Sequence, residues 1–248
     1  ATTEIYTLSL HDALPIFPNT KTLYWRGLVF SDFDGRTWRM GSPPEQQRKR
    51  QKHSAIWGKK NSVLDNLPTS SEIKNYQITF EPSHQPWLYA LDYPLTSSSK
   101  VGLTAEYTLL AKGIIDKRSR YTMTSSPSWI IDPILDSESR KHNLKIPNNG
   151  NTRAKQFAIN RRSKSTSDQQ FVDDTLNYYH QKPFYYSLKP PRLGEHTIDE
   201  FIFETRKGFC EHYAGSFVFL MRAAGIPARV VAGYQGGEKS SEGDYLLV

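Results

Sequence analysis

The chain has 248 residues, of which 23% are charged and 12% aromatic, which is enough for one large domain or two small ones. A net charge of +7 would suit an anionic partner, but the basic residues gather in loop-like stretches at 46–53 and 161–165. No nucleic-acid-binding motif accompanies them, so we expect no nucleic-acid partner. The single cysteine excludes an internal disulfide and a CxxC metal or redox motif, and no apolar run is long enough to predict a membrane span.

Both ends of the sequence look cut. The first residue is Ala1 rather than Met, and Val248 lies inside a strand-like run. Residues 1–16 resemble a translated sequencing-adapter segment, so we expect them to be non-native and leave them out of the fold prediction. The rest is predicted to form a β-rich N-terminal domain over residues 17–146 and an α+β domain over residues 147–248, truncated at its end.

The N-terminal part reads as strands and turns. Residues 23–38 place two aromatic-rich runs around Asp34 and Gly35, which predicts a hairpin. Residues 76–81 and 101–110 alternate apolar and polar side chains, and each is predicted to be one half-buried antiparallel strand.

Helices are predicted in the second half of the chain. Ser167 and Gln170 have the spacing of a capping box, and apolar residues from Phe171 to Tyr179 recur at a helical period. Pro183 is predicted to end that helix.

Cys210 is predicted to lie in the first turn of a buried helix. Apolar residues recur after it at helical spacing, Gly225 is expected to end the helix, and Pro227 prevents its resumption before a strand at 228–232. The N–H groups and dipole of a helix N-terminus favour a thiolate, and a backbone N–H there can donate to an oxyanion. On these facts alone, a small buried apolar residue is the alternative interpretation of Cys210.

A nucleophilic cysteine needs a histidine base within reach. His212 lies two positions further on, about 200° round the helix, so we expect it to point away from Cys210. His180 and His196 precede the helix, and nothing in their spacing requires either to fold back. The spacing of these residues matches no zinc motif, so we expect neither a metal nor a cofactor.

Residues 199–238, DEFIFETRKGFCEHYAGSFVFLMRAAGIPARVVAGYQGGE, closely resemble the nucleophile segment of the bacterial transglutaminase-like superfamily. The upstream KPFYYSL and the N-terminal YWRG and FDGRTW are similar to the membrane-bound branch of that superfamily. The resemblance implies an α+β fold, with a β-rich N-terminal domain and a papain-like or transglutaminase-like core. It implies that Cys210 is the nucleophile and that the partner histidine and aspartate lie beyond Val248.

The resemblance further implies cysteine-dependent acyl transfer on carboxamides, like that of a protein-glutamine gamma-glutamyltransferase, in the intact parent protein. The substrates would be a protein or peptide carboxamide and an amine acceptor. The parent would be anchored in the bacterial inner membrane by segments absent here, with this part facing the periplasm, and the fragment alone is expected to be inactive. Tyr185 and Tyr186 are candidates for lining the oxyanion site, although core packing is favoured for each.

Two alternatives stay open. Water as the acceptor would make the parent a peptidase or amidase acting at the cell envelope. A non-enzymatic module that binds cell wall or protein would instead use the tryptophans of the β-rich domain, although core packing is favoured for these as well. They are Trp25, Trp38, Trp57 and Trp87.

Overall fold

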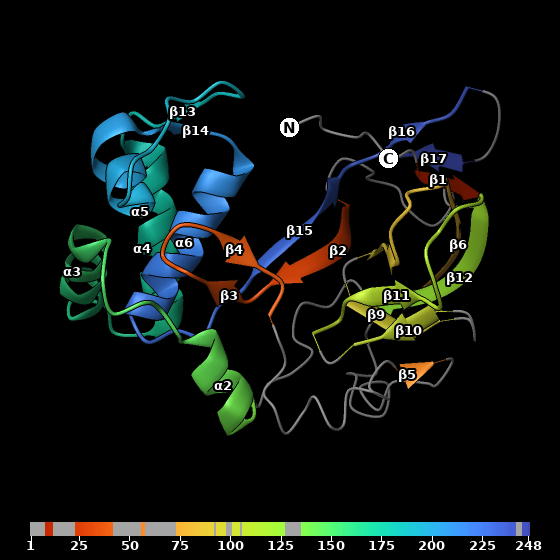
Figure 1. Ribbon diagram of the computed structural model, residues 1–248, viewed down its shortest axis with the longest axis horizontal. Coiled ribbons are helices and arrows are strands. Elements are labelled where there is room, and N and C mark those ends of the chain that lie inside the picture. The colour runs from red at the N-terminus through yellow and green to blue at the C-terminus, as the bar shows by residue number, and fades with distance from the viewer. Residues whose placement is uncertain are drawn as a thin grey trace. The chain divides into compact units, whose positions relative to one another are not determined.

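The computed structural model describes nine stretches of the chain (Figure 1). They are residues 8–11, 23–41, 56–57, 73–91, 93–97, 101–104, 106–126, 135–241 and 245–248. They form a mixed α+β fold with a β-rich N-terminal region, as the sequence predicts.

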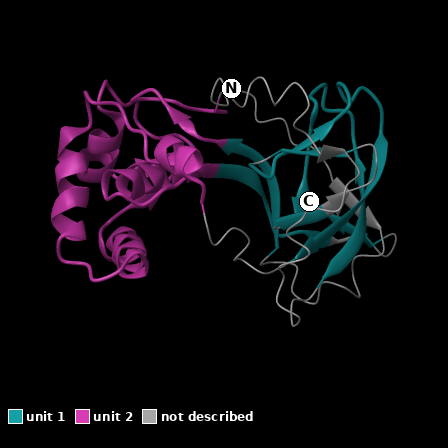
Figure 2. Cartoon of the chain, turned by 90° about the horizontal axis from the view of Figure 1, so that it is seen from below, with its two compact units in different colours: residues 1–29, 43–134, 231–248 teal, residues 30–42, 135–230 magenta. Residues whose placement is uncertain are grey.

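The chain forms two compact units that interleave along the sequence (Figure 2). The first unit comprises Ala1–Val29, Pro43–Ile134 and Val231–Val248, and the second comprises Phe30–Ser42 and Leu135–Val230. The predicted domains, 17–146 and 147–248, are consecutive stretches of sequence, and their boundary stays a prediction.

Three sheets make up the described part of the first unit. The six-stranded sheet has the order β16 (Glu238–Lys239), β17 (Tyr245–Leu247), β1 (Leu8–His11), β6 (Lys74–Phe80), β12 (Ser119–Ser126) and β9 (Tyr93–Ser97). The four-stranded sheet has the order β5 (Ile56–Trp57), β10 (Val101–Leu103), β11 (Leu109–Ala111) and β7 (Trp87–Leu88). The three-stranded sheet has the order β15 (Val230–Gln235), β2 (Tyr24–Phe30) and β8 (Ala90–Leu91).

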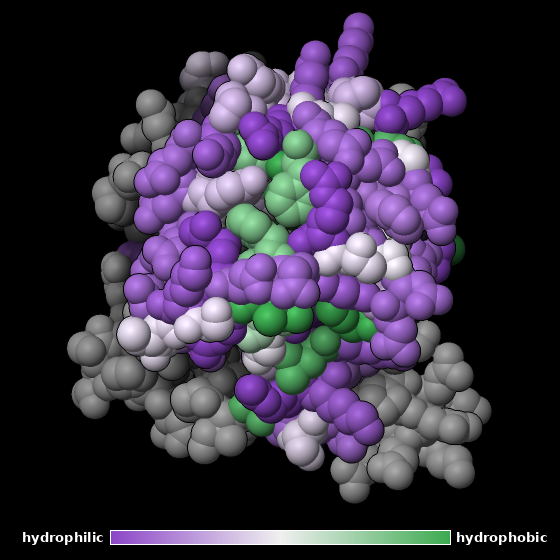
Figure 3. Space-filling view, turned by 90° about the vertical axis from the view of Figure 1, so that its left-hand side faces the viewer, coloured by the Kyte–Doolittle hydropathy of each residue, from purple (hydrophilic) through white to green (hydrophobic). Residues whose placement is uncertain are grey.

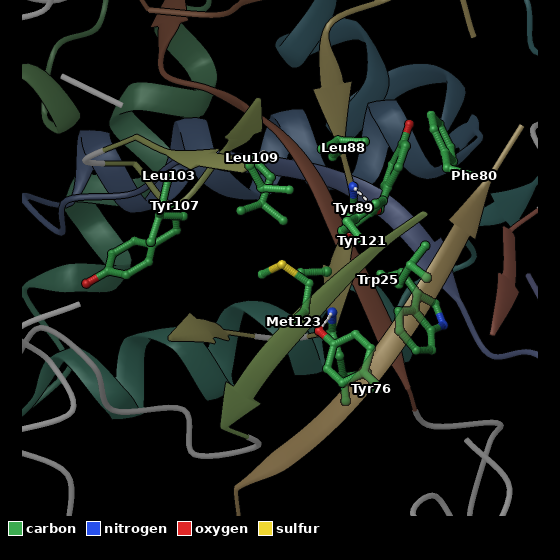
Figure 4. Close-up of a cluster of buried hydrophobic side chains, with 14 of the residues drawn as sticks. Trp25, Tyr76, Phe80, Leu88, Tyr89, Leu103, Tyr107, Leu109, Tyr121 and Met123 are labelled. Carbon is green, nitrogen blue, oxygen red and sulfur yellow. Dashed lines mark hydrogen bonds between the residues drawn. The ribbon is translucent and has the colours of Figure 1, made fainter. Parts of the chain in front are cut away.

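Large aromatic side chains pack among aliphatic ones in the core of this unit (Figure 4). β6 confirms the strand predicted there: Tyr76, Ile78 and Phe80 are buried, although Thr79 between the last two is buried as well. Two of the buried aromatics donate to backbone carbonyls: the indole of Trp25 donates to that of Gly236 and the Tyr121 hydroxyl to that of Tyr89, each over 2.8 Å. The core therefore buries large rings without leaving these donors unpaired.

The strand predicted over 101–110 is wrong, because the segment turns back on itself. β10 and β11 pair antiparallel. Between them the Thr108 amide donates to the side-chain oxygen of Thr104 over 3.0 Å, and the Thr104 amide donates to the Thr108 carbonyl over 2.9 Å. Tyr107 adopts a left-handed conformation with a φ of +63°. Alternating apolar residues suit either a continuous strand or a hairpin, and the Thr104 hydroxyl stabilises the turn.

The hairpin predicted at Asp34 and Gly35 is present but short. It joins β3 (Asp32–Phe33) to β4 (Trp38–Arg39). The carboxylate of Asp34 accepts from the amides of Thr37 and Arg36, and these bonds, with Arg39 nearby, lower the pKa of Asp34. The longer upstream run, β2, pairs with β8 instead.

β1 lies inside the segment that is predicted to be non-native. Leu8–His11 pairs antiparallel with both β6 and β17. Ladder bonds join backbone groups, so an extended segment can occupy this place whatever its side chains. The non-native origin of residues 1–16 stays a prediction.

The second unit is mainly helical. Its elements are the β3–β4 hairpin, α2 (Ser137–Asn143), α3 (Thr152–Arg162), α4 (Asp168–Gln181), β13 (Tyr185–Tyr186), α5 (Thr197–Glu200), the π-helical turn η3 (Phe201–Thr205), β14 (Lys207–Gly208) and α6 (Cys210–Ala223). The face shown in Figure 3 is mainly hydrophilic, with apolar side chains gathered near its centre.

Helix α4 begins and ends where the sequence predicts. The Ser167 hydroxyl accepts from the Gln170 amide over 3.1 Å, which is the first half of the predicted capping box. The Gln170 side chain reaches the amide of Thr166 rather than that of Ser167. The helix stops at Gln181, two residues before Pro183.

Two buried side chains cap each other's helices. The Asn151 side-chain oxygen accepts from the amides of Ile198 and Asp199, at the start of α5. The Asp199 carboxylate in turn accepts from the amides of Arg153 and Ala154, at the start of α3, over 3.1 and 2.7 Å. Asp199 is only 4% exposed. These bonds hold the segment before the Cys210 helix to α3.

We expect Asp199→Ala to lower the free energy of unfolding by about 2–3 kcal/mol, because it leaves one buried and one part-buried amide unpaired at a helix start. Urea denaturation measures the change. Asp173→Ala is the matched control, since Asp173 is exposed and, among the described residues, accepts only from the Gln169 side chain. Its effect should stay within about 0.5 kcal/mol. Similar losses in the two variants would contradict the capping role.

Candidate active site

Helix α6 starts at Cys210, as predicted. At its other end, Gly225 has a φ of +81° and its amide donates to the Arg222 carbonyl over 3.0 Å. The Ile226 amide donates to the Met221 carbonyl over 2.9 Å. This pair of bonds is a Schellman motif, which satisfies the last carbonyls and releases the chain toward β15.

Burial changes sharply along α6. Cys210 is exposed, which excludes the alternative of a small buried residue. Its thiol makes no hydrogen bond within the described part of the chain. The later turns of the helix are buried, and these residues are Gly215, Ser216, Val218, Phe219, Leu220, Met221 and Arg222. The helix is thus anchored by its body and presents its first residue to solvent.

The strand that leads into Cys210 pairs with an exposed aromatic segment. β13 and β14 are parallel, with Tyr186 opposite Gly208. The amides of Tyr185 and Ser187 donate to the carbonyls of Arg206 and Gly208, each over 2.8 Å. Tyr185 and Tyr186 are 60% and 66% exposed, so the favoured prediction of core packing is wrong for both. Their proposed place at an oxyanion site stays a prediction.

Five aromatic rings, which we call the aromatic cluster, lie beneath this segment. They are Tyr178, Tyr179, Phe184, Phe201 and Tyr213. The Phe184 centroid lies 4.9 Å from that of Tyr179, 5.6 Å from that of Phe201 and 6.0 Å from that of Tyr213. Because Phe184 directly precedes β13 and Tyr213 lies on α6, this packing fixes the exposed segment relative to the start of the helix.

A buried hydroxyl pair ties α4 to α6. The oxygens of Tyr179 and Ser216 lie 2.7 Å apart, and the Ser216 hydroxyl donates to the Tyr213 carbonyl over 3.1 Å. Tyr179 is therefore the donor to Ser216. Burial raises the pKa of Tyr179 well above its ordinary value, so the phenol remains protonated and acts as a structural donor.

None of the nearby histidines is arranged as a base for the thiol. The Nδ1 atom of His212 accepts from the Phe209 amide over 3.5 Å, and the ring packs on Phe209 and Phe201. Burial lowers the pKa of His212, against an opposing effect of Glu211, so the ring is neutral near pH 7. His180 and His196 are exposed, and no hydrogen bond joins any described histidine to Cys210.

A second polar group has the composition of a hydrolytic triad but not its geometry. Nε2 of His142 lies 3.2 Å from Oγ of Ser31 and 3.4 Å from Oδ1 of Asp32. A catalytic triad places serine and carboxylate on opposite ring nitrogens, whereas here both contact the same one. Ser31 is also only 1% exposed. These contacts join the residues at the start of the hairpin to α2, and we assign them a structural role.

The hairpin packs on the middle of α6 through Trp38. Its ring stacks on Phe33 with centroids 4.6 Å apart, and the Arg222 guanidinium lies 4.9 Å from its centre. A Cβ atom on Gly215 would lie 2.8 Å from the indole nitrogen. This contact was not evident from the sequence, because the two residues are far apart along the chain.

The described residues hold no cluster of three His, Cys, Asp or Glu side chains that could bind a metal. None of the described helices has the length and apolar character needed to cross a membrane.

Comparison with known families accounts for both regions of the chain. Residues 155–246 match the transglutaminase-like superfamily, and residues 16–129 match the TgpA N-terminal domain. The chain therefore belongs to the transglutaminase-like superfamily, which confirms the resemblance seen in the sequence.

Particular relatives agree with this assignment. The chain is 39% identical over 231 residues to the protein-glutamine gamma-glutamyltransferase of Pseudomonas aeruginosa, covering 93% of this chain but 32% of that protein. It is 30% identical over 149 residues to the uncharacterized protein YebA of Bacillus subtilis, covering 53% of this chain and 20% of that protein. The chain thus spans about a third of the first relative's length and a fifth of the second's.

The fold also matches a solved structure. The crystal structure of the periplasmic domain of TgpA from Pseudomonas aeruginosa superposes with a TM-score of 0.85 at 35% identity. The match covers 99% of this chain and 80% of that chain, which confirms the predicted fold class.

We expect Gly215→Ala to lower the free energy of unfolding by about 1 kcal/mol, although alanine is the better helix former. The added methyl group would collide with Trp38. In a Trp38→Leu background, the same substitution should stabilise the protein by about 1 kcal/mol.

Chemical denaturation of the unchanged protein, the two single variants and the double variant measures both values. Gly113→Ala is the control, because no atom of the described residues lies within 4 Å of its added Cβ. The same sign of change in both backgrounds would show that Trp38 does not limit the space at Gly215.

Proposed function

We propose that this chain carries the nucleophile of a cysteine acyltransferase that acts on glutamine carboxamides, in the manner of a protein-glutamine gamma-glutamyltransferase. The observation that supports it is the exposed Cys210 at the first position of an otherwise buried helix, in a member of the transglutaminase-like superfamily. A reactive thiol needs access to substrate together with a rigid support, and α6 provides both.

In the proposed reaction the Cys210 thiolate attacks the carbonyl carbon of a glutamine side chain. A tetrahedral oxyanion forms, its C–N bond breaks, and ammonia leaves with a proton from a general acid. The thioester is then attacked by an amine, which loses a proton, forms an isopeptide bond and releases the thiolate. The first amides of α6, on Cys210 and Glu211, have no acceptor among the described residues and suit the oxyanion.

We place the general acid and its orienting carboxylate beyond Val248, as the resemblance implies. The support is the arrangement of the described histidines: His212 contacts its own helix start, and His180 and His196 do not bond to Cys210. A general acid typically contributes about 10²–10⁴-fold to the rate, so the 248-residue chain alone should show no appreciable turnover.

Two alternatives differ from this proposal, one in the acceptor of the acyl group and the other in the use of the tryptophans. With water as acceptor, the same thioester would give an amidase or peptidase. The binding-module alternative needs exposed aromatic side chains, but Trp25 is fully buried and the Trp38 indole nitrogen is buried against α6. The side chain of Trp57 lies outside the described residues.

In a longer version of the protein that extends past Val248, Cys210→Ala should lower turnover of a glutamine peptide and an amine by at least about 10³-fold. Mass spectrometry of the product separates isopeptide formation from hydrolysis to glutamate. His180→Gln is the control and should keep the parent rate. Turnover by the 248-residue chain equal to that of the longer protein would refute the placement of the general acid.

We further propose that the whole protein sits in the bacterial inner membrane, held by segments outside this chain, with the Cys210 unit facing the periplasm. The support is the similarity to the periplasmic domain of TgpA. A protein or peptide glutamine donor and an amine acceptor would meet it there.

A membrane-impermeant maleimide tests this orientation in intact cells whose outer membrane has been made permeable. We expect labelling of Cys210, because the thiol is exposed. A Cys210→Ser version of the whole protein is the control for labelling elsewhere. Labelling of Cys210 only after the inner membrane is lysed would place this unit in the cytoplasm.

A further inference from the structure

The segment that pairs with the strand before Cys210 exposes three large apolar side chains. Tyr185, Tyr186 and Leu188 are 60%, 66% and 77% exposed. We call them the apolar strip. They follow Phe184, which is held in the aromatic cluster, so a rigid base carries them. A rigid exposed aromatic surface is typical of a binding site, since little conformational entropy is lost on contact.

The backbone of this strip also has an open edge. The ladder to β14 uses the amides of Tyr185 and Ser187. Strand alternation therefore directs the N–H and C=O of Tyr186 to the opposite edge, where no described strand pairs with β13. Such an edge can accept an extended peptide as an added strand.

The charges around the strip favour an acidic occupant. Residues 182–192 contain Lys182, Lys189 and Arg192 and no acidic residue, and Lys207 lies opposite Tyr185. All four cations are exposed, and none forms an ion pair with the described part of the chain. Carboxylates on a bound peptide would complement them.

We propose that β13 and the apolar strip bind an extended, acidic segment of the acyl donor that flanks the reactive glutamine. The inference rests on the proposed role of Cys210 as nucleophile. In the bound state the peptide backbone pairs with Tyr186, an apolar peptide side chain packs on the strip, and acidic side chains face Lys189 and its neighbours.

Chain geometry limits the spacing between this segment and the glutamine. Cys210 follows Gly208 by two residues, a reach of at most about 7 Å. A strand added outside β13 lies two strand spacings from β14, or about 10 Å. The total of about 17 Å corresponds to about five residues of extended peptide. The recognised segment therefore lies within about five residues of the glutamine.

The test measures binding without chemistry, by fluorescence anisotropy on the 248-residue chain carrying Cys210→Ser. Two fluorescein-labelled peptides each carry one glutamine and one Leu-Tyr-Asp-Asp segment. The segment lies four residues before the glutamine in one peptide and four residues after it in the other. We expect one of them to bind at least tenfold more tightly than a peptide with Lys in place of Asp. When ten residues separate the segment from the glutamine, the longer protein should be acylated no faster than by a glutamine peptide that lacks the segment.

Protein variants locate the binding surface. The triple change Tyr185→Ser, Tyr186→Ser and Leu188→Ser should weaken binding at least tenfold. The matched control is Ile159→Ser with Leu176→Ser, which removes exposed apolar side chains from α3 and α4 and should leave affinity within twofold. Equal losses in the two variants would overturn the proposal.

Backbone pairing has its own signature, which does not depend on the folding of any variant. N-methylation of single peptide amides should weaken binding at alternate positions only, because alternate amides face the β13 edge. Loss at every position, or at none, would contradict strand addition. Acylation of Cys210 in the longer protein is measured separately, so that weak peptide binding with normal acylation refutes this inference alone. Tight binding without acylation refutes the proposed function instead.

Discussion

Burial of helix α6 beyond its first turn is the constraint on which the second unit depends. A helix covered along most of its length has few places where it can meet solvent, and here that place is its N-terminus. The aromatic cluster packs near its start and Trp38 packs on its middle. Tight packing on these faces leaves little freedom to shift or rotate, so the position of Cys210 follows from contacts distant from it.

Hydrogen bonds between helices reinforce this packing, because apolar contacts alone would allow one helix to slide along another. The pair of Tyr179 and Ser216 fixes α4 relative to α6, and the exchange of caps between Asn151 and Asp199 fixes α3 relative to α5. Hydrogen bonds are directional, so each pair selects one arrangement among several that would bury similar apolar area. The second unit combines an apolar core with a few such bonds between helices.

The features that sequence reasoning predicted correctly are those with local causes. Ser167 caps the helix that follows it directly, and Gly225 ends α6 through bonds to residues one turn away. Residues 101–110 were misread because alternation does not distinguish one strand from two. Tyr185 and Tyr186 were misread because aromatic composition suggests burial, while a two-stranded ladder leaves its faces open. The Asn151–Asp199 and Trp38–Gly215 contacts join distant residues and have no signal in a single sequence.

The interleaving of the two units has a consequence for synthesis. The chain passes from one unit to the other at residues 29/30, 42/43, 134/135 and 230/231. β2 pairs with β15, so the three-stranded sheet waits until the ribosome has added about two hundred further residues. At about 5–20 residues per second, this takes roughly 10–40 s. During that interval β2 has an unpaired edge beside a growing chain, and its protection falls to chaperones or to temporary pairing within the nascent polypeptide.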